Sequence, residues 1–271
     1  MATTGFETRF EEIQPGCPEF GEAALLPWDI AIFGFAVAAF RVPRSGLGIS
    51  PGIAATRQCF HSWMQRHSIA VCACSIEAVN EVWKALLPEL GFRFVDFSLQ
   101  ARFRSLASAR LPPAPILLRP AEPRDAPRIE DIASRAFCHG RYFADVHFPK
   151  DLARLRYRRW VANALASKGD DRVYVTEENG DVDGFFHLLI DGEAADLRLA
   201  AVAPELRKTG LGFHLYAAML QQLKDRGVRR VRASISAANT EVMSIYAALG
   251  FYFDRPELIY HWRPGNGVLP G

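Results

Sequence analysis

The sequence has almost no excess of charge of one sign. Its 271 residues include 32 lysines and arginines against 30 aspartates and glutamates, which gives a formal net charge of +2. Nucleic-acid binding usually requires a concentrated basic face. The densest basic cluster, residues 154–159, favours a solvated helix face over such a surface. We therefore expect no nucleic-acid partner.

Long hydrophobic runs are also lacking. The first apolar run, residues 30–40, is about half as long as a helix that spans a bilayer. Acidic residues come before it, which is unlike the start of a signal peptide: Glu7, Glu11 and Glu12. We expect a cytoplasmic protein with no membrane partner.

Cysteine is scarce, and its positions show no paired metal-ligand spacing. The five cysteines are Cys17, Cys59, Cys72, Cys74 and Cys138. Two of them, Cys72 and Cys74, are separated by one residue on an apolar strand, so both point to the same face. Buried free thiols in a reducing compartment are the interpretation that we prefer. We expect no bound metal.

A glycine-containing turn stands out among the segments that are present. An apolar strand, residues 194–202, is followed by Pro204 and then by Arg207, Lys208, Thr209, Gly210, Leu211, Gly212 and Phe213. A helix is predicted over residues 213–226. Glycines allow the backbone N–H groups to approach a ligand, and the helix start and the basic side chains favour negative charge. The pattern predicts a phosphate or pyrophosphate site, although an ordinary strand–turn–helix with a basic corner would also fit.

The residues that follow make the pattern more specific. A strand predicted over residues 228–235 precedes Asn239, Tyr246 follows seven residues later, and Leu249-Gly250-Phe251 ends the segment. This order and spacing resembles the GNAT superfamily of acyl-CoA-dependent N-acetyltransferases. The resemblance implies an α/β (α+β) fold with a central mixed, mostly antiparallel sheet. It also implies acetyl-CoA as the acyl donor and a small-molecule amine as the acceptor.

The resemblance also assigns roles to residues. The backbone of Ala200, Ala201 and Val202 would pair with the pantetheine arm, and residues 207–213 would bind the pyrophosphate. Asn239 would contact the cofactor arm. Tyr246 would lie near the thioester sulfur, where a phenol can stabilise and protonate the leaving thiolate. A core tyrosine is the alternative interpretation of Tyr246.

The general base is not assigned by these patterns. Remaining candidates are Glu193 and Asp196 near the strand before the turn, and His187. For His187, a satisfied core or surface histidine is the more ordinary interpretation. Water could also serve as the base.

The first part of the chain contains a faint copy of the second part. A shift of 159 residues places Asn80 on Asn239 and Leu90-Gly91-Phe92 on Leu249-Gly250-Phe251, with Leu87 on Tyr246. The first copy has no Arg-x-x-Gly-x-Gly.

We predict a partial, non-catalytic GNAT-like domain at 1–110, a proline-rich linker at 111–115, a catalytic GNAT domain at 116–263 and a tail at 264–271. The order expected within 116–263 is βααβββαβαβ. In the first domain, Gly34 suggests a bulge or bend in a strand.

A narrower resemblance bears on the substrate. Residues 26–34 read Leu-x-Trp-Asp-x-x-x-Phe-Gly, and the second domain carries Ser134, Phe137, Arg141, Tyr142, Tyr157, Trp160 and Asn163. This arrangement looks like the TDP-fucosamine acetyltransferases. It implies a nucleotide-linked amino-deoxy sugar as acceptor, with direct attack in a ternary complex. Arg141, Tyr142, Trp160 and Asn163 are the implied substrate-binding residues, although a helix–loop–helix surface with a partly buried aromatic would fit equally well.

Two other functions stay open at this point. The chain could acetylate another small amine or a peptide N-terminus, or it could be a non-catalytic acyl-CoA-binding sensor. A homodimer is also open.

Overall fold

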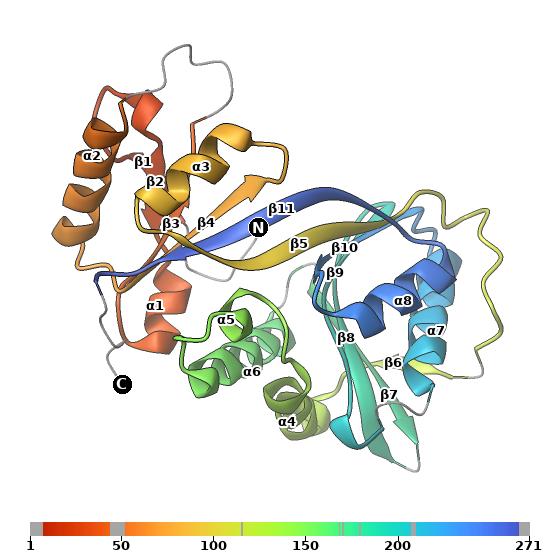
Figure 1. The fold of residues 1–271 in the computed structure, drawn as a ribbon. Coiled ribbons are helices and arrows are strands. Elements are labelled where there is room, and N and C mark those ends of the chain that lie inside the picture. Colours follow the sequence, from red (N-terminus) through yellow and green to blue (C-terminus); the bar gives the residue numbers. More distant parts are fainter. Residues whose placement is uncertain are drawn as a thin grey trace. The chain divides into compact units, whose positions relative to one another are not determined.

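The computed structural model describes residues 8–43, 52–114, 116–167, 169, 171–178, 180–206 and 210–265. The chain divides into two compact units. Unit 1 comprises Met1–Ser98, Arg141–Leu152 and Arg255–Gly271, and unit 2 comprises Leu99–Gly140 and Ala153–Asp254. Strand β5 (Arg93–Phe103) carries the chain from unit 1 into unit 2, and β11 (Tyr252–Trp262) carries it back (Figure 1). The functional domain boundaries given above stay a prediction.

Unit 1 is built on the strand order β1-β2-β3-β4-β11-β5. Its β3 and β4 are parallel, whereas β1–β2, β2–β3 and β4–β11 are antiparallel. The elements are β1 (Glu11–Glu12), a 3₁₀ turn (Pro18–Phe20), β2 (Glu22–Leu25), α1 (Pro27–Phe33), β3 (Val37–Arg41), α2 (Ile53–Arg66), β4 (Val71–Glu77), α3 (Glu81–Glu89) and α5 (Arg141–Ala144).

The core of unit 1 is formed mainly by aromatic side chains. Phe60 and Trp63 of α2 are buried against Phe40 of β3, Phe92 at the start of β5 and Trp262 of β11. Such rings prefer edge-to-face packing, and the Phe60 and Trp262 planes lie 87° apart. Cys72 and Cys74 are buried free thiols in the same core, as predicted, and burial raises the pKa of both.

Unit 2 has the strand order β11-β5-β10-β9-β8-β7-β6. Strands β9 and β10 are parallel, whereas the pairs β6–β7, β7–β8 and β8–β9 are antiparallel. The elements are β6 (Leu118–Pro120), a 3₁₀ turn (Pro123–Asp125), α4 (Ala126–Ala136), α6 (Lys150–Ala166), β7 (Asp171–Glu178), β8 (Asp181–Asp191), β9 (Ala194–Val202), a 3₁₀ turn (Pro204–Leu206), α7 (Leu211–Asp225), β10 (Arg230–Ser236) and α8 (Thr240–Leu249). The predicted order βααβββαβαβ is confirmed, with the short helix α5 added.

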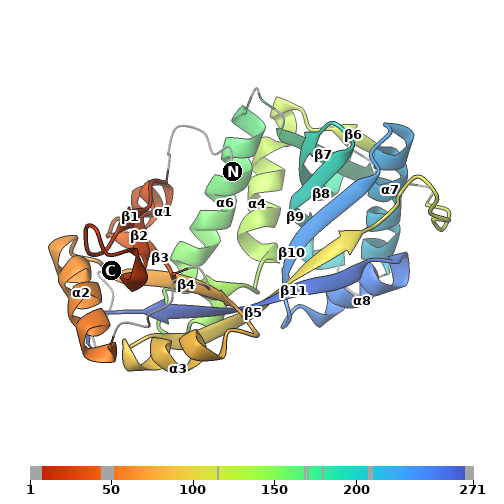
Figure 2. The same cartoon turned by 90° about the horizontal axis from the view of Figure 1, so that it is seen from above.

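Helices cover both faces of the unit 2 sheet (Figure 2). Alternation along β8 sends Phe185 to the α4 and α6 face and Phe186 to the α7 face. Helix α7 buries a nearly continuous stripe at helical spacing: Leu215, Tyr216, Met219, Leu220 and Leu223. The mixed, mostly antiparallel sheet with helices on its faces is the predicted fold class.

The internal copy is confirmed in the element boundaries. Strand β4 begins at 71 and ends at 77, and β10 begins at 230 and ends at 236. Strands β5 and β11 begin at 93 and 252 and end at 103 and 262. Every one of these boundaries is shifted by the 159 residues that the sequence indicated.

The helices between these strands begin and end alike. The Asn80 side chain caps α3 by accepting from the Trp83 N–H, and Asn239 caps α8 by accepting from the Val242 N–H. Gly91 and Gly250 follow the two helices at φ +92° and +96°, where glycine is strongly favoured. The two copies therefore share local backbone design and differ in side chains such as Leu87 and Tyr246.

One expectation for unit 1 is wrong. Gly34 does not bend a strand, because it lies at φ +77° directly after helix α1 and its N–H bonds to the Ile30 carbonyl. Pro27 at the first turn of α1 favours this helix over the strand that the apolar run suggested. Among the described helices, none combines the length and the apolar character that crossing a membrane requires.

Candidate active site

Two parallel strands of unit 2 separate where the predicted site begins. Residues 194–197 of β9 pair with residues 230–233 of β10, but β9 continues to Val202. On its other side β9 stays paired with β8, up to Val202 opposite Gly184. In the described part of the sheet, the β10-facing edge of Ala200, Ala201 and Val202 therefore has no strand partner. Free backbone groups on such an edge can pair with an extended ligand.

The turn after β9 leads to the start of α7. Gly210 precedes this helix at φ +83°, and a Cβ placed on it would meet no atom of the described residues within 4 Å. A Cβ on Gly212 would lie 3.4 Å from Ile245. Leu211 and Phe213 are partly buried against the core, which fixes the first turn. The start of this helix therefore offers N–H groups and the positive end of the helix dipole, which are features that favour anion binding. Arg207, Lys208 and Thr209 lie outside the described residues.

Asn239 has a structural role as the cap of α8. Its Oδ1 accepts a hydrogen bond from the Val242 N–H at 3.3 Å. This bond fixes the amide next to the C-terminal end of β10. Contact of Asn239 with a cofactor arm stays a prediction.

Tyr246 is a buried tyrosine of α8 with a second tyrosine beside it. It is 4% exposed, its ring stacks on Phe251 at 4.6 Å, and it meets the Tyr216 ring edge-on at 5.3 Å. The two hydroxyls are hydrogen-bonded to each other. Burial, together with the neighbouring Tyr216, raises the pKa of Tyr246 well above its usual value. The phenol therefore carries its proton at neutral pH, which is the form that a proton donor needs.

The three candidate bases lie in different surroundings of unit 2. Glu193 pairs with Arg229 at the surface, and Asp196 pairs with Arg198 and Arg232, each at 3.2 Å.

His187 is buried and its Nε2 lies 2.7 Å from Asp171, while its Nδ1 has no hydrogen-bond partner among the described residues. Burial lowers the pKa of His187, although Asp171 opposes the shift. The general base stays unassigned.

The structure joins Arg141 and Tyr142 to Asp29 of the early motif. The Tyr142 hydroxyl donates to Asp29 Oδ2 at 2.8 Å, and the Arg141 guanidinium lies 3.6 Å from the same carboxylate and 4.8 Å from the Tyr142 ring centre. All three residues belong to unit 1, and Asp29 and Tyr142 are buried. The network is sufficient to explain Tyr142 as a structural residue, and its role in substrate binding stays a prediction.

The other two implied substrate residues, Trp160 and Asn163, lie on α6 in unit 2. Trp160 is half-buried, with the Arg156 guanidinium 5.2 Å from its ring centre and Tyr157 stacked nearby. Tyr157 in turn stacks on Phe137 at 4.3 Å. Phe137, Tyr157 and Trp160 thus form one stacked row.

Sequence reasoning missed Tyr216 and Asp29 as partners of predicted site residues. Tyr216 falls on the buried stripe of α7, so helical periodicity would have placed its hydroxyl in the core, where it needs a partner. Asp29 stands directly before the apolar run of residues 30–40, and a buried aspartate requires a donor. Among the described residues, no group of three or more His, Cys, Asp or Glu side chains is arranged to hold a metal ion.

Comparison with known proteins supports the predicted fold. Residues 128–251 match the model of the Acetyltransferase (GNAT) family. A solved GCN5-related N-acetyltransferase from Sphaerobacter thermophilus is similar to this chain with a TM-score of 0.65 and 17% identity, covering 93% of this chain and 79% of that one. The fold is therefore the GNAT fold.

Two curated proteins are similar in sequence. The spore coat polysaccharide biosynthesis protein SpsD of Bacillus subtilis is 30% identical over 149 residues, which cover 55% of this chain and 51% of that protein. The match thus spans about half the length of that relative. The dTDP-fucosamine acetyltransferase of Escherichia coli is 25% identical over 230 residues, which cover 83% of this chain and 91% of that protein.

Two buried histidines predict how stability depends on pH. Burial lowers the pKa of His187 and of His261, whose Nδ1 lies 2.7 Å from Asp145. As the pH falls below about 6.5, the unfolded chain binds protons that the folded chain does not bind. We expect the urea midpoint to fall between about pH 7.5 and 5.5. His187→Asn and His261→Asn should each flatten this dependence, whereas His214→Asn, at an exposed position, should not. Equal slopes in all variants would contradict this account.

Proposed function

We propose, from the premise that the chain belongs to the acetyltransferase (GNAT) family through residues 128–251, that it transfers the acetyl group of acetyl-CoA to an amino group. The finer proposal is that the acceptor is an amino-deoxy sugar linked to a nucleotide. The acceptor attacks directly, with both substrates bound at once.

The single observation that carries the proposal is the separation of β9 from β10. Pairing ends at Leu197 opposite Ala233, while the backbone of β9 runs on for five residues. An extended arm with amide groups can replace the missing strand along Ala200, Ala201 and Val202. The pantetheine part of acetyl-CoA has such amides, so this edge suits it.

The start of α7 suits the pyrophosphate. Gly210 stands at the helix N-terminus, where N–H groups and the helix dipole favour negative charge. Arg207, Lys208 and Thr209 are proposed to add charge and further donors. Gly212, Phe213 and Leu211 would shape the first turn against which the phosphates rest.

Tyr246 is proposed as the proton donor of the reaction. The amine nitrogen forms a bond to the acetyl carbon as the carbon–sulfur bond breaks, and the sulfur leaves as a thiolate. Tyr246 donates its proton to this thiolate and recovers a proton from solvent. The second proton of the attacking amine passes to water or to a base that stays unassigned. Tyr216, whose hydroxyl bonds to that of Tyr246, would orient the phenol.

The nature of the acceptor is the finer part of the proposal. Support comes from the similarity to the dTDP-fucosamine acetyltransferase, which extends over 91% of that protein. Arg141, Tyr142, Trp160 and Asn163 are proposed to bind the acceptor. Arginine suits a diphosphate and aromatic rings suit the apolar face of a sugar.

Release of free thiol from acetyl-CoA across a panel of amines tests the proposed function. The panel contains nucleotide-linked amino sugars, free amino sugars, amino acids and a peptide with a free N-terminus. We expect the highest kcat/KM with a nucleotide-linked amino sugar, because the diphosphate supplies binding energy that free sugars lack. Highest activity with the peptide would contradict the acceptor class. Absence of turnover with every amine, together with intact acetyl-CoA binding, would favour a sensor.

Tyr246→Phe separates a catalytic tyrosine from a packing tyrosine. If the phenol protonates the thiolate, kcat should fall by about 10²–10⁴-fold with little change in acetyl-CoA affinity, when chemistry limits the rate. Tyr216→Phe is the matched control, because it removes the same hydroxyl–hydroxyl bond but keeps the proton donor. It should retain most of the activity. Wild-type kcat in a folded Tyr246→Phe enzyme would remove Tyr246 from the mechanism.

A further inference from the structure

A buried carboxylate of unit 1 lies beside one of the residues proposed to bind the acceptor. Asp29 stands in the first turn of α1 and is 3% exposed. Its Oδ2 accepts a hydrogen bond from the Tyr142 hydroxyl at 2.8 Å and lies 3.6 Å from Arg141 Nη2. A carboxylate that is removed from water is costly unless a donor or an opposite charge compensates it. Tyr142 supplies the donor and Arg141 supplies the charge.

Tyr142 also links the carboxylate to the guanidinium. The hydroxyl that donates to Asp29 accepts from Arg141 Nη2 at 3.2 Å, and the Arg141 guanidinium lies 4.8 Å from the Tyr142 ring centre. Arg141 is thus held by an ion pair, a hydrogen bond and a cation–π contact. Because a free arginine side chain has many rotamers, these three contacts select one position for its charge.

The ring of Tyr142 is fixed by packing. Phe33, Phe148 and His261 surround it, with their ring centres 5.2, 4.6 and 5.5 Å from its own. Phe33 is the last residue of the same helix α1 that carries Asp29. A packed aromatic cluster therefore sets the position of the Tyr142 hydroxyl relative to the carboxylate.

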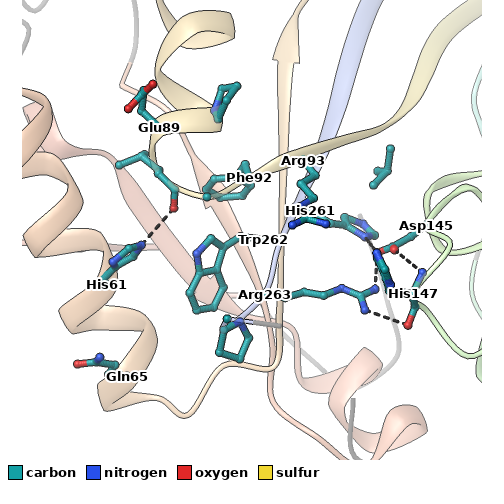
Figure 3. A pocket seen from close by; sticks show the side chains of 16 residues that line it. His61, Gln65, Glu89, Phe92, Arg93, Asp145, His147, His261, Trp262 and Arg263 are labelled. Carbon is teal, nitrogen blue, oxygen red and sulfur yellow. Dashed lines mark hydrogen bonds and ion pairs between the residues drawn. The ribbon is translucent and has the colours of Figure 1, made fainter. Parts of the chain in front are cut away.

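The backbone that carries Arg141 is tied to unit 1 at a second point. Asp145, which lines a cavity of unit 1, bonds to His261 Nδ1, to the Arg263 guanidinium and to the His147 N–H (Figure 3). Burial raises the pKa of the Asp145 carboxyl, but these donors outweigh burial and hold it at about 2. The Asp145 N–H donates to the Arg141 carbonyl at 3.1 Å, which closes the single turn of α5. The turn that presents Arg141 is therefore fixed.

Part of the Arg141 side chain is still accessible to a ligand. This side chain is 32% exposed, whereas that of Asp29 is 4% exposed. The carboxylate is thus covered, while the guanidinium has surface left. A guanidinium that is already oriented loses less side-chain entropy when it binds a diphosphate than one that rotates freely.

We propose that Asp29 is a positioning residue for the acceptor: it holds the Arg141 guanidinium, directly and through Tyr142, in the orientation that binds the diphosphate. This inference rests on the proposed function, because it takes a nucleotide-linked amino sugar as the acceptor. It gives residues 1–110, which carry no proposed catalytic residue, a part in acceptor binding. A purely structural ion pair would instead affect the stability of unit 1 and leave the acceptor KM unchanged.

The direction of one change in KM tests this inference. Steady-state kinetics with acetyl-CoA and the nucleotide-linked amino sugar that the wild type uses best compares the wild type with Asp29→Asn, which keeps an acceptor oxygen for Tyr142. Loss of a negative charge would by itself strengthen the binding of a diphosphate. Loss of positioning predicts the opposite. We expect the acceptor KM to rise about threefold to tenfold, while kcat and the KM for acetyl-CoA change less than about twofold. A lower or an unchanged acceptor KM would overturn the inference.

A double-mutant cycle shows whether Asp29 acts through Arg141. Arg141→Gln alone should raise the acceptor KM about tenfold to a hundredfold, because a charge-assisted contact to the diphosphate is lost. Adding Asp29→Asn to Arg141→Gln should then change KM less than about twofold. Glu22→Gln, which removes a carboxylate from an exposed ion pair of unit 1, is the matched control and should behave as the wild type. Equal effects of Asp29→Asn in both backgrounds would contradict action through Arg141.

Tyr142→Phe gives a second variant that does not depend on the asparagine substitution. It keeps the Asp29 carboxylate and the packed ring but removes the hydroxyl between Asp29 and Arg141. The acceptor KM should rise in the same direction, by about twofold to fivefold. Urea midpoints check that each variant is folded. A wild-type KM in folded Tyr142→Phe would refute the link through this hydroxyl.

Two further measurements separate this inference from the proposed function. A free amino sugar has no diphosphate, so Asp29→Asn should change its KM less than about twofold. If the wild type acetylates no nucleotide-linked amino sugar, the proposed function is wrong. Calorimetry with UDP and dTDP, which carry the same diphosphate, then decides the inference without acetyl transfer. Both should bind the wild type more tightly than Asp29→Asn, and equal affinity, or binding to neither protein, would overturn it.

Discussion

The candidate site of unit 2 depends on the point where β9 and β10 stop pairing. Parallel strands that stay together satisfy each other's backbone groups, whereas strands that separate leave a row of N–H and C=O groups free. The pairing ends at Leu197 and Ala233, and the free edge leads directly to Gly210 and the start of α7. Two proposed binding elements thus follow in sequence from one break in the sheet: an edge for an extended arm and a helix N-terminus for phosphates.

The two copies have the same backbone elements, but only the second copy has the side chains of the proposed chemistry. The β4–α3–β5 segment repeats the boundaries and the asparagine cap of β10–α8–β11. The two copies therefore share one backbone design. The side chains of the two copies differ. Leu87, which is fully buried, occupies the position that corresponds to Tyr246, so unit 1 has no phenol that could bond to a second tyrosine as Tyr246 bonds to Tyr216. Unit 1 instead carries its own polar group, the Asp145–His261 pair, beside a cavity.

Local patterns in the sequence were enough for most of the fold. The sequence predicted the helix over residues 213–226, the strand over 228–235, the element order within 116–263 and the shift of 159 residues between the two copies. The prediction that Gly34 bends a strand was wrong because an apolar run is compatible with a strand or a short helix. Pro27 in the first turn favours the helix. The polar pairs could not be predicted, since Asp29 and Tyr142 are 113 residues apart and Asp145 and His261 are 116 apart. Such contacts depend on the packed structure rather than on spacing.

Calorimetric titration with acetyl-CoA tests the central claim, that unit 2 alone binds the acyl donor at the start of α7. Gly210 and Gly227 flank this helix at φ +83° and +82°, and a Cβ added to either would meet no atom within 4 Å in the part of the chain that the structure describes. Valine at either position thus costs similar backbone strain. The account predicts one acetyl-CoA per chain in the wild type and in Gly227→Val, and strongly weakened binding in a folded Gly210→Val. Two acetyl-CoA molecules per chain, or equal affinity in the two variants, would contradict it.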